Sequence, residues 1–274
     1  MRLEGKTALV TGSTDGVGRL LAIRLADQGA HVLVHGRDRD RGEQVLDRIR
    51  AAGRGSAEFL QADFAALAEV RRLAEMVRQG CDRLDILVNN AGIGSGGSGG
   101  KREISRDGHE LRFAVNYLAG FLLTRLLLPL MARSRPARIV NVSSLGQHPI
   151  EFDDVMLTSG YSGGRAYTQS KLAQIMFTFD LARELDPATV TANCLHPATY
   201  MATTMVRQSG VTPISTVEEG AEAILNLAVS EQLAGISGAF YNGLRPARAN
   251  AQAYDDKARE QLRALSVRLT ALPP

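Results

Sequence analysis

A glycine-rich turn between a short apolar strand and a helix constrains this chain more than any other feature of its sequence. Residues 7–11 form an apolar run, and residues 17–28 repeat apolar side chains at helical spacing. The turn between them reads Thr11-Gly12-Ser13-Thr14-Asp15-Gly16-Val17-Gly18. Gly12 is expected to turn the chain sharply, Gly16 to let a ligand approach the backbone, and Gly18 to let helix and strand pack closely. A diphosphate can then bind the free N–H groups at the helix N-terminus, so the turn predicts a dinucleotide site. A simple tight turn is the alternative for three glycines alone.

Strand and helix signals alternate along the rest of the chain, which is typical of a parallel sheet with crossover helices. Further strands are expected at residues 31–35, 57–61, 86–89, 138–142, 190–194 and, as a seventh, near 239–241. Helices are expected at 39–52, 67–78, 110–131 and 165–185. The strands lack polar alternation, so both faces should be buried. We therefore expect an α/β fold with a Rossmann-type, doubly wound, mostly seven-stranded parallel sheet and helices on both faces. Residues 1–274 should form a single domain, with the glycine-rich stretch 94–100 as a mobile loop inside it.

The end of the second strand bears on which dinucleotide fits. A carboxylate at this place holds the ribose 2′-hydroxyl of NAD, whereas this sequence has Gly36 followed by Arg37. A guanidinium binds a 2′-phosphate through paired hydrogen bonds, and a carboxylate repels it. Arg37 therefore indicates NADP(H). The alternatives are that Arg37 is a solvated turn residue and that Asp38 binds the ribose instead.

Three motifs follow one another along the chain. They are Gly-x-x-x-Gly-x-Gly in the first turn, Asn89-Asn90-Ala91-Gly92 after the fourth strand, and Tyr167-x-x-x-Lys171 on a long helix. Together they resemble the short-chain dehydrogenase/reductase family over about residues 5–272, in its NADP-preferring branch. The resemblance implies that Asp63 binds the adenine, with the alternative that it caps the helix before Leu67. The residues expected to bind NADP(H) are Gly12, Ser13, Thr14, Asp15, Gly16, Val17, Gly18, Arg37, Asp63, Phe64, Asn90, Ala91, Gly92, Tyr167, Lys171, Pro197 and Thr199.

Tyr167 and Lys171 lie four residues apart, so their side chains should project from one face of the helix. The pKa of a free tyrosine is about 10, and a nearby ammonium lowers it by favouring the phenolate. Lys171 thus gives a reason for Tyr167 to act as acid in reduction and as base in oxidation. A pair on the helix surface is the alternative for this motif taken alone. The resemblance also implies that Ser144, with Ser143 as the adjacent alternative, hydrogen-bonds the substrate oxygen, and that Asn116 joins Lys171 to water in a proton relay.

One segment departs from the family pattern. Residues 195–199 read Leu-His-Pro-Ala-Thr where the family usually has Pro-Gly, and Ala198 resists a positive φ. The threonine expected five residues after that proline falls on Ala202, with Thr203 and Thr204 just beyond. Contacts of this segment with the nicotinamide are therefore left open. Three further residues are interpreted as structural: His148, His196 and Cys194.

The expected reaction interconverts an alcohol and a ketone or aldehyde. Residues 107–113 and 120–124, the insert between Ser144 and Tyr167, and the tail from Lys257 to Leu272 resemble the retinol-dehydrogenase-like branch, whose members often take apolar substrates. A C-terminal tail helix is expected at about 251–270. A substrate lid is expected at about 196–215. In it, Met201, Met205 and Val206 form either an adaptable apolar wall or ordinary helix packing. The alternatives are a tailoring reductase or dehydrogenase acting on a larger natural product, and a non-catalytic NADPH-binding regulator.

Composition limits the other function classes. The chain has 274 residues, a net charge of +3 and two cysteines. The cysteines lack the partners of a zinc site, so no metal is expected, and the scattered basic residues argue against a nucleic-acid-binding face. No run approaches the ~18 apolar residues of a membrane helix, and the N-terminus lacks the apolar core of a signal peptide, so a cytoplasmic protein is expected. The resemblance implies a homodimer or homotetramer paired through residues 110–131 and 165–185. The tail helix should pack on its own domain, with an oligomer interface as the alternative.

Overall fold

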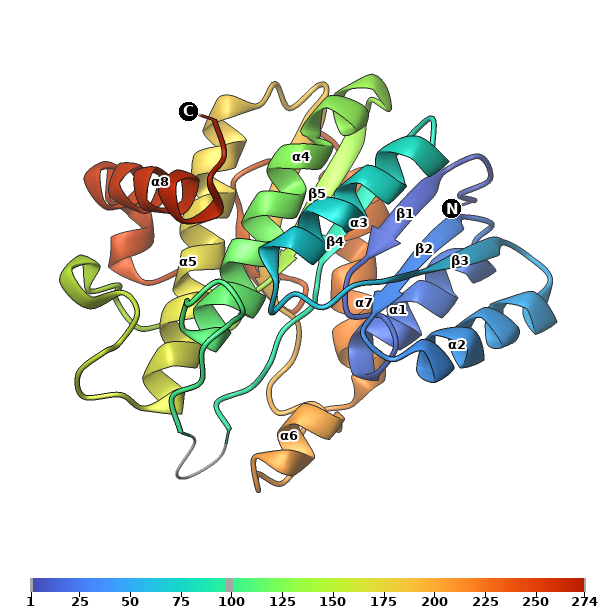
Figure 1. The fold of residues 1–274 in the computed structure, drawn as a ribbon. Coiled ribbons are helices and arrows are strands. Elements are labelled where there is room, and N and C mark those ends of the chain that lie inside the picture. The colour runs from blue at the N-terminus through green and yellow to red at the C-terminus, as the bar shows by residue number, and fades with distance from the viewer. Residues whose placement is uncertain (1, 97–100, 274) are drawn as a thin grey trace.

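The computed structural model describes residues 2–96 and 101–273, in which eight strands form one sheet (Figure 1). The strands lie in the order β3-β2-β1-β4-β5-β6-β7-β8, and every neighbouring pair is parallel except β7 and β8. The chain reverses its direction of winding between β1 and β4, and folds of this kind bind ligands at the carboxyl ends of such strands. The strands are β1 Thr7–Val10, β2 His31–Gly36, β3 Ser56–Gln61, β4 Ile86–Asn89, β5 Ala137–Val142, β6 Val190–His196, β7 Phe240–Asn242 and β8 Arg245–Ala247.

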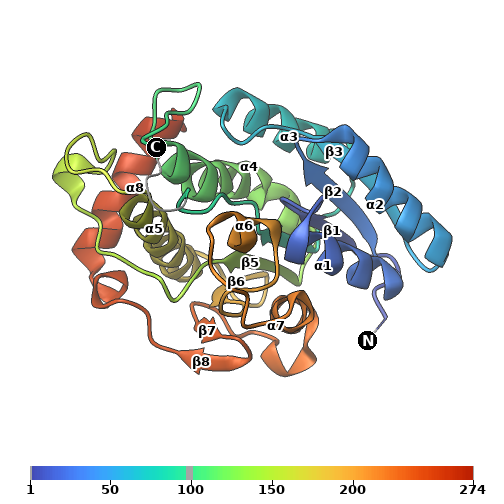
Figure 2. The ribbon, with the colours of Figure 1, turned by 90° about the horizontal axis from the view of Figure 1, so that it is seen from below.

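Helices cover both faces of the sheet, as the sequence predicts (Figures 1 and 2). One face carries α1 (Gly16–Asp27), α2 (Arg39–Ala52) and α7 (Val217–Val229), and the other carries α3 (Leu67–Gly80), α4 (Ala119–Arg133) and α5 (Gly163–Glu184). Successive strand residues point to opposite faces. Leu9 and Leu87 therefore enter the core under α3, α4 and α5, whereas Val10 and Val88 enter the core under α1 and α7. Two apolar cores explain why the central strands show no polar alternation. The edge strand β3 differs from the prediction, because Ser56, Glu58 and Gln61 are exposed.

The sheet has one strand more than the predicted seven. β8 pairs antiparallel with β7 at the edge of the sheet and is largely exposed. It spans only three residues and contains Pro246, which lacks an N–H and is tolerated in a sheet mainly at edges. An exposed strand of this length has neither the apolar run nor the alternation by which strands are recognised in a sequence.

The long helix predicted at 110–131 divides into two kinds of helix. Residues Phe113–Leu118 form a π-helix, η1, and α4 follows directly. Apolar spacing does not distinguish the two, since both bury most of their side chains here. Short π-helical segments often occur at functional sites, and this one contains Asn116.

Residues Phe113–Arg133 are also long and apolar enough to cross a membrane by length and composition, which the sequence analysis did not expect. In the fold, 67% of this apolar window is buried. It packs against α3 and α5, as a central helix of a globular fold does.

The remaining helices are short, apart from the last. They are α6 (Thr204–Gln208), the 3₁₀ turns η2 (Phe152–Asp154), η3 (Glu231–Leu233) and η4 (Ala251–Tyr254), and α8 (Asp256–Thr270). η4 and α8 occupy the place of the predicted tail helix and lie against α5 (Figure 1). Buried Ser266 of α8 also meets the hydroxyl of Tyr117 in η1, with 2.7 Å between the oxygens. The tail therefore packs on the fold it belongs to.

Candidate active site

The glycine turn leaves β1 and opens α1. Gly12 and Gly16 have φ values of 64° and 53°, a region in which a Cβ is strained. A Cβ on Gly18 would collide with the carbonyl oxygen of Gly12 and the side chain of Asn90, so the helix packs directly on the turn. Asp15 caps α1 by accepting a hydrogen bond from the N–H of Gly16 at 2.7 Å.

The turn lies against the residues that follow β4. A Cβ at Gly12 would be 2.8 Å from Cα of Ala91. Asn90 donates through Nδ2 to the carbonyl oxygens of Thr11 at 2.8 Å and Gly12 at 3.1 Å. The backbone around the turn is thus close-packed, with no space for side chains at Gly12 or Gly18. Such a cradle fits a nicotinamide dinucleotide, because its diphosphate must approach the backbone closely.

β2 ends beside this turn. A Cβ at Gly36 would be 2.5 Å from Cγ2 of Thr14, so any side chain at this position would have to displace Thr14. Asp38, the alternative ribose ligand, caps α2 and accepts a hydrogen bond from the N–H of Arg41 at 3.1 Å. Arg37 is exposed, and its carbonyl oxygen accepts a hydrogen bond from Gln61 at 2.8 Å. The backbone of Arg37 is therefore fixed while its guanidinium lies in solvent.

Asp63 follows β3 and stabilises a turn. Its Oδ1 accepts a hydrogen bond from the N–H of Ala65 at 3.0 Å. Helix α3 begins after Ala66, which supplies no side-chain cap, and the N–H of Leu67 donates instead to Asp107 at 2.8 Å. The alternative interpretation of Asp63 as the cap of this helix is therefore wrong. The carboxylate that meets the helix comes from a residue 40 positions away, which sequence spacing does not reveal.

The four residues predicted to be catalytic come together from three elements. Ser144 follows β5, Tyr167 and Lys171 lie on α5, and Asn116 lies in η1. Ser144 accepts a hydrogen bond from the N–H of Gly146 at 3.0 Å, and its hydroxyl is near enough to the phenol of Tyr167 to affect the pKa of that phenol.

The adjacent Ser143, which is the alternative to Ser144, uses its hydroxyl differently. It is buried and donates a hydrogen bond to the backbone carbonyl of Lys171 at 2.7 Å. Ser144 is therefore the serine whose hydroxyl is directed to Tyr167.

The ammonium of Lys171 is buried and held in one position. It donates hydrogen bonds to the carbonyl oxygen of Val142 and to Oε1 of Gln174, both at 2.9 Å. Its Nζ lies 5.7 Å from the ring centroid of Tyr167. Gln174 was not predicted to belong to the site, although a polar residue three positions from Lys171 on a buried helix is a signal of such a contact.

Burial shifts the pKa of both side chains on α5. Burial raises the pKa of Tyr167 above its ordinary value, while the hydrogen bond with Ser144 lowers it. Burial lowers the pKa of Lys171 to about 7. The sequence predicted a lowered pKa for Tyr167, and this prediction is wrong in sign, because the cost of burying a phenolate outweighs the stabilisation of its charge. Tyr167 is accordingly a neutral phenol at neutral pH.

Asn116 connects η1 to the loop after β4. Its Oδ1 accepts from the N–H of Ile93 at 2.8 Å, and its Nδ2 donates to the carbonyl oxygen of Ile93 at 3.1 Å and to Ser170 at 2.9 Å. A Cβ at Gly92 would be 3.3 Å from Oδ1 of Asn116 and 3.7 Å from Nζ of Lys171. The absence of a side chain at Gly92 therefore leaves a space that both polar groups border.

The segment after β6, which departs from the family pattern, does not require a positive φ at Ala198. The residue with a positive φ is Tyr200, at 46°, and not Ala198. Pro197 follows the end of β6, and Thr199 Oγ1 lies 3.0 Å from Nε2 of His196. Burial, and the nearby charge of Lys171, lower the pKa of His196 to about 4. His196 is therefore neutral and holds Thr199. Backbone strain such as that at Tyr200 often occurs at functional sites.

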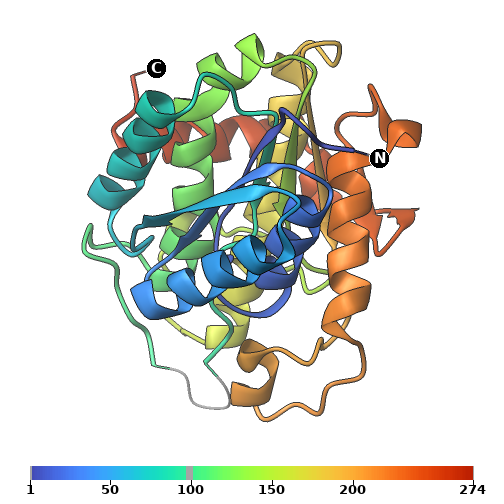
Figure 3. The ribbon, with the colours of Figure 1, turned by 90° about the vertical axis from the view of Figure 1, so that its right-hand side faces the viewer.

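α6 is the short orange helix at the bottom of Figure 3, and residues of this segment lie beside both the glycine turn and the loop after β4. A Cβ at Gly16 would be 3.2 Å from Cγ2 of Thr203, and one at Gly94 would be 3.0 Å from Cγ of Met205. Met201 instead packs against α7. Each interpretation of the methionines thus applies to one of them. Met201 packs against the core, whereas Met205 is 38% exposed beside the loop after β4.

A buried ion pair, missed by the sequence analysis, fixes the start of that loop. Arg112 donates to the carbonyl oxygens of Gly94 at 3.0 Å and Ser95 at 3.2 Å. Glu110, 3.5 Å from Arg112, balances its charge. The hydroxyl of Tyr161 accepts from Arg112 at 2.7 Å and donates to Glu110 at 3.1 Å. We call these three side chains the Arg112 network. Of the predicted mobile loop 94–100, residues 97–100 lie outside the described residues.

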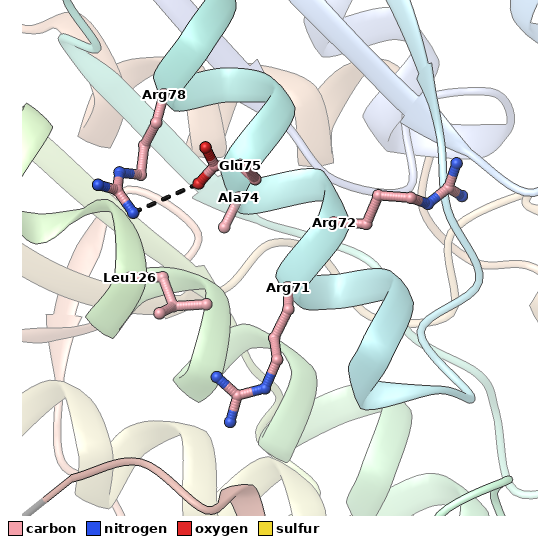
Figure 4. Close-up of a pocket in the computed structure, with 6 residues that line it drawn as sticks. All are labelled: Arg71, Arg72, Ala74, Glu75, Arg78 and Leu126. Carbon is pink, nitrogen blue, oxygen red and sulfur yellow. Dashed lines mark hydrogen bonds and ion pairs between the residues drawn. The ribbon is translucent and has the colours of Figure 1, made fainter.

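A separate surface pocket of about 370 Å³ lies between α3 and α4 (Figure 4). It is lined by Arg71, Arg72, Ala74, Glu75, Arg78 and Leu126. Its arginines are engaged within the chain: Arg78 pairs with Glu75 at 3.5 Å, and Arg71 donates to the carbonyl oxygen of Thr270. Since no predicted catalytic residue lines it, this pocket is distinct from the candidate active site.

Known proteins resemble this chain in sequence and in structure. A family model described as short chain dehydrogenase matches residues 6–212. Human retinol dehydrogenase 13 is 35% identical over 291 residues, covering 98% of this chain and 86% of the relative. Mouse retinol dehydrogenase 11 is 35% identical over 285 residues, covering 100% of this chain and 89% of the relative.

Two solved structures extend the comparison to the fold. An uncharacterized protein from Mycobacterium paratuberculosis has a TM-score of 0.79 and 28% identity, covering 98% of this chain and 95% of its own. RhlG of Pseudomonas aeruginosa, solved as an NADP active-site complex, has a TM-score of 0.71 and 29% identity, covering 88% of this chain and 95% of its own.

Proposed function

The chain belongs to the short-chain dehydrogenase family, and on this premise we propose that it is an NADP(H)-dependent oxidoreductase that interconverts an alcohol with a ketone or aldehyde. One observation carries the proposal: Ser144, Tyr167 and Lys171 converge beside a glycine turn that is shaped for a dinucleotide. When bound, the nicotinamide supplies or accepts a hydride. The chain itself must then position the substrate oxygen and move a proton.

Tyr167 is the proposed proton donor in reduction. The substrate carbonyl oxygen accepts hydrogen bonds from the hydroxyls of Ser144 and Tyr167. As the carbonyl carbon gains a hydride, its C=O double bond becomes a C–O single bond and the oxygen takes the phenolic proton of Tyr167, which completes the alcohol. Because burial raises the pKa of Tyr167, the phenol is protonated and ready to donate at neutral pH. Oxidation requires the phenolate, so it is favoured at alkaline pH.

Lys171 and Asn116 support this proton transfer. Protonated Lys171 stabilises the phenolate that remains after Tyr167 has donated its proton. The pKa of Lys171, lowered to about 7 by burial, allows it to exchange protons near neutral pH. Asn116 and Lys171 border the same space at Gly92, so we assign Asn116 to the relay that supplies Lys171 with protons from water.

The end of β2 supports NADP(H) over NAD(H). Arg37 is exposed on a fixed backbone, and Asp38 is engaged as the cap of α2. A side chain at Gly36 would have to displace Thr14, which disfavours a carboxylate there. RhlG of Pseudomonas aeruginosa was solved with NADP, and a further neighbour at 25% identity, from Shigella flexneri, was also solved as an NADP complex.

An apolar small molecule is the proposed substrate. Leu145, next to Ser144, is 45% exposed, and Met205 of α6 is also partly exposed. Apolar surface thus lies next to the serine that is proposed to bind the substrate oxygen. The relatives named above are retinol dehydrogenases, and retinol is an apolar alcohol. We propose that residues 196–215 act as the lid over this substrate.

The test is NADPH and NADH oxidation by the wild-type protein with a panel of carbonyl compounds. The panel contains all-trans-retinal, an aliphatic aldehyde, an aryl ketone and a large polycyclic ketone. We expect turnover of at least one apolar compound, with a higher kcat/KM for NADPH than for NADH. Turnover of the polycyclic ketone alone would favour a tailoring enzyme. NADPH binding without turnover of any carbonyl would favour a regulator and contradict the proposal.

A further inference from the structure

His35 is buried at the end of β2, directly beneath the glycine turn, and the proposed chemistry does not use it. The N–H of Gly12 donates to its Nδ1 at 3.1 Å, and its Nε2 lies 3.2 Å from the carbonyl oxygen of Ala62. A backbone N–H can only donate, so Nδ1 is the acceptor and Nε2 carries the proton that is donated to Ala62. The surroundings therefore select one neutral form of the ring.

The imidazole is one of several links between β2 and the turn. Two others use the backbone of His35: the N–H of Ser13 donates to the His35 carbonyl at 2.8 Å, and the His35 N–H donates to Oγ of Ser13 at 2.9 Å. Any residue at position 35 can keep these two bonds. A substitution therefore keeps the backbone links of β2 to the turn, and it removes the contacts of the ring.

The same ring contacts the loop after β3. It stacks on Phe64, with 4.4 Å between the ring centroids and 28° between the planes. Ala62 and Phe64 are the neighbours of Asp63, which is the predicted adenine ligand. His35 thus touches the glycine turn on one side and both neighbours of Asp63 on the other.

We propose that His35 is a positioning residue for the adenosine half of NADP(H). It fixes the separation between the Gly12 turn and the Asp63 loop before the dinucleotide binds. A site held in its binding geometry loses less conformational freedom on binding and therefore binds more tightly. The inference rests on the proposed function, because it assumes that NADP(H) occupies this site. His35 itself touches the walls of the site and takes no part in hydride or proton transfer.

Three substitutions distinguish the contributions of the two hydrogen bonds that the ring makes. His35→Asn keeps an acceptor near the position of Nδ1 and loses the donor to Ala62. His35→Gln keeps a polar group near the position of Nε2 and loses the acceptor for Gly12. His35→Leu loses both. His31→Leu is the matched control, because His31 lies on the same strand but pairs with Ser56, away from the turn.

The readout is the Kd of NADPH, measured by fluorescence titration of each folded variant, with its Tm recorded in parallel. We expect a Kd about tenfold higher for His35→Leu, because this variant loses both hydrogen bonds of the ring. A smaller increase is expected for His35→Asn, and no change for His31→Leu. A lower Tm with an unchanged Kd of NADPH in all three His35 variants would show a purely structural role and overturn the proposal.

A second measurement needs no cofactor. Two-bond ¹H–¹⁵N correlation spectra of the imidazoles report which ring nitrogen carries the proton. The proposal requires the Nε2–H form of His35 at pH 7, and the Nδ1–H form or the protonated ring would overturn it. If the wild-type protein shows the Nε2–H form but does not bind NADPH, both this proposal and the proposed cofactor fail. Wild-type binding with unchanged variants overturns the role of His35 alone.

Discussion

At the scale of single residues, we propose that Arg37 gives the protein its preference for NADP(H) over NAD(H). Its backbone is fixed by Gln61 and its guanidinium is in solvent at the end of β2. We expect Arg37→Ala to weaken NADPH binding by roughly 1–3 kcal/mol, the range for hydrogen bonds to a charged group, and to leave NADH nearly unchanged. Isothermal titration with both cofactors measures this. Arg39→Ala is the control, since Arg39 is an exposed neighbour at the start of α2. Equal losses for NADPH and NADH would contradict the assignment to the 2′-phosphate.

His35 makes stability depend on pH. Burial lowers its pKa from 6.5 to about 4, so the folded protein resists binding a proton that the unfolded chain accepts. The stabilisation is complete above pH 6.5, is lost as the pH falls towards 4, and amounts to about 3 kcal/mol for a fully buried ring. Urea unfolding at pH 7 and at pH 4.5 measures the loss. His35→Asn cannot titrate, so it should lose less stability than the wild type over this interval. An equal loss in both proteins would assign the effect to other groups.

Residues that act through local spacing were predictable from the sequence, and residues that act through distant partners were not. Gly12 and Gly16 were recognisable because one short turn requires their positive φ. Tyr167 and Lys171 were recognisable because four residues of helix align them. Arg112, by contrast, bonds to Tyr161, 49 positions away. The sign of the Tyr167 pKa shift was also beyond the sequence, because it depends on the depth of burial.

At the scale of elements, the Arg112 network joins the loop after β4 to the start of α5. Tyr161 precedes α5, which carries Tyr167 and Lys171, and the loop meets Met205 of α6 at Gly94. Burial raises the pKa of Tyr161 to about 12, so its hydroxyl remains a donor to Glu110 at neutral pH. The network therefore fixes the start of the loop after β4, which contacts Met205 of α6 at Gly94.

Tyr161→Phe removes one hydroxyl from this network and leaves the ring in place. We expect the KM for the carbonyl substrate to rise about fivefold, or about 1 kcal/mol, because the hydroxyl makes two hydrogen bonds of roughly 0.5–1.5 kcal/mol each, while the Kd of NADPH stays the same. Steady-state kinetics with the most active compound of the panel, combined with NADPH titration, separate the two. Tyr254→Phe is the matched control, because Tyr254 lies in η4, outside the Arg112 network, and is 43% exposed. A rise in the NADPH Kd with no change in KM would place the network on the cofactor side instead.

Two elements were not predictable for a physical reason. β8 is a three-residue exposed edge, and its pairing depends on β7 more than on its own residues. The π-helix η1 has the apolar content of an α-helix. What distinguishes it is a change in backbone hydrogen bonding, which residue spacing does not record.

For the whole molecule, the order of the motifs was enough to predict the doubly wound sheet with helices on both faces. Buried strands and amphipathic helices alternate along the chain, and only one handedness of crossover is common.

The predicted assembly into a homodimer or homotetramer is a separate question. α5, one of the two helices predicted to pair in a homo-oligomer, is covered by α8, and its residues 171–179 are buried within the chain itself. The homodimer or homotetramer paired through both helices therefore stays a prediction.

Proton donation from Tyr167 to a substrate carbonyl is tested most directly by one comparison. NADPH oxidation with the most active carbonyl compound is measured for the wild type and for Tyr167→Phe, with NADPH titrated into both proteins. We predict that kcat/KM falls roughly 10²–10⁴-fold, the contribution of a positioned acid, while NADPH still binds to both proteins. Turnover by Tyr167→Phe at the wild-type rate would contradict the assignment of Tyr167 as the proton donor.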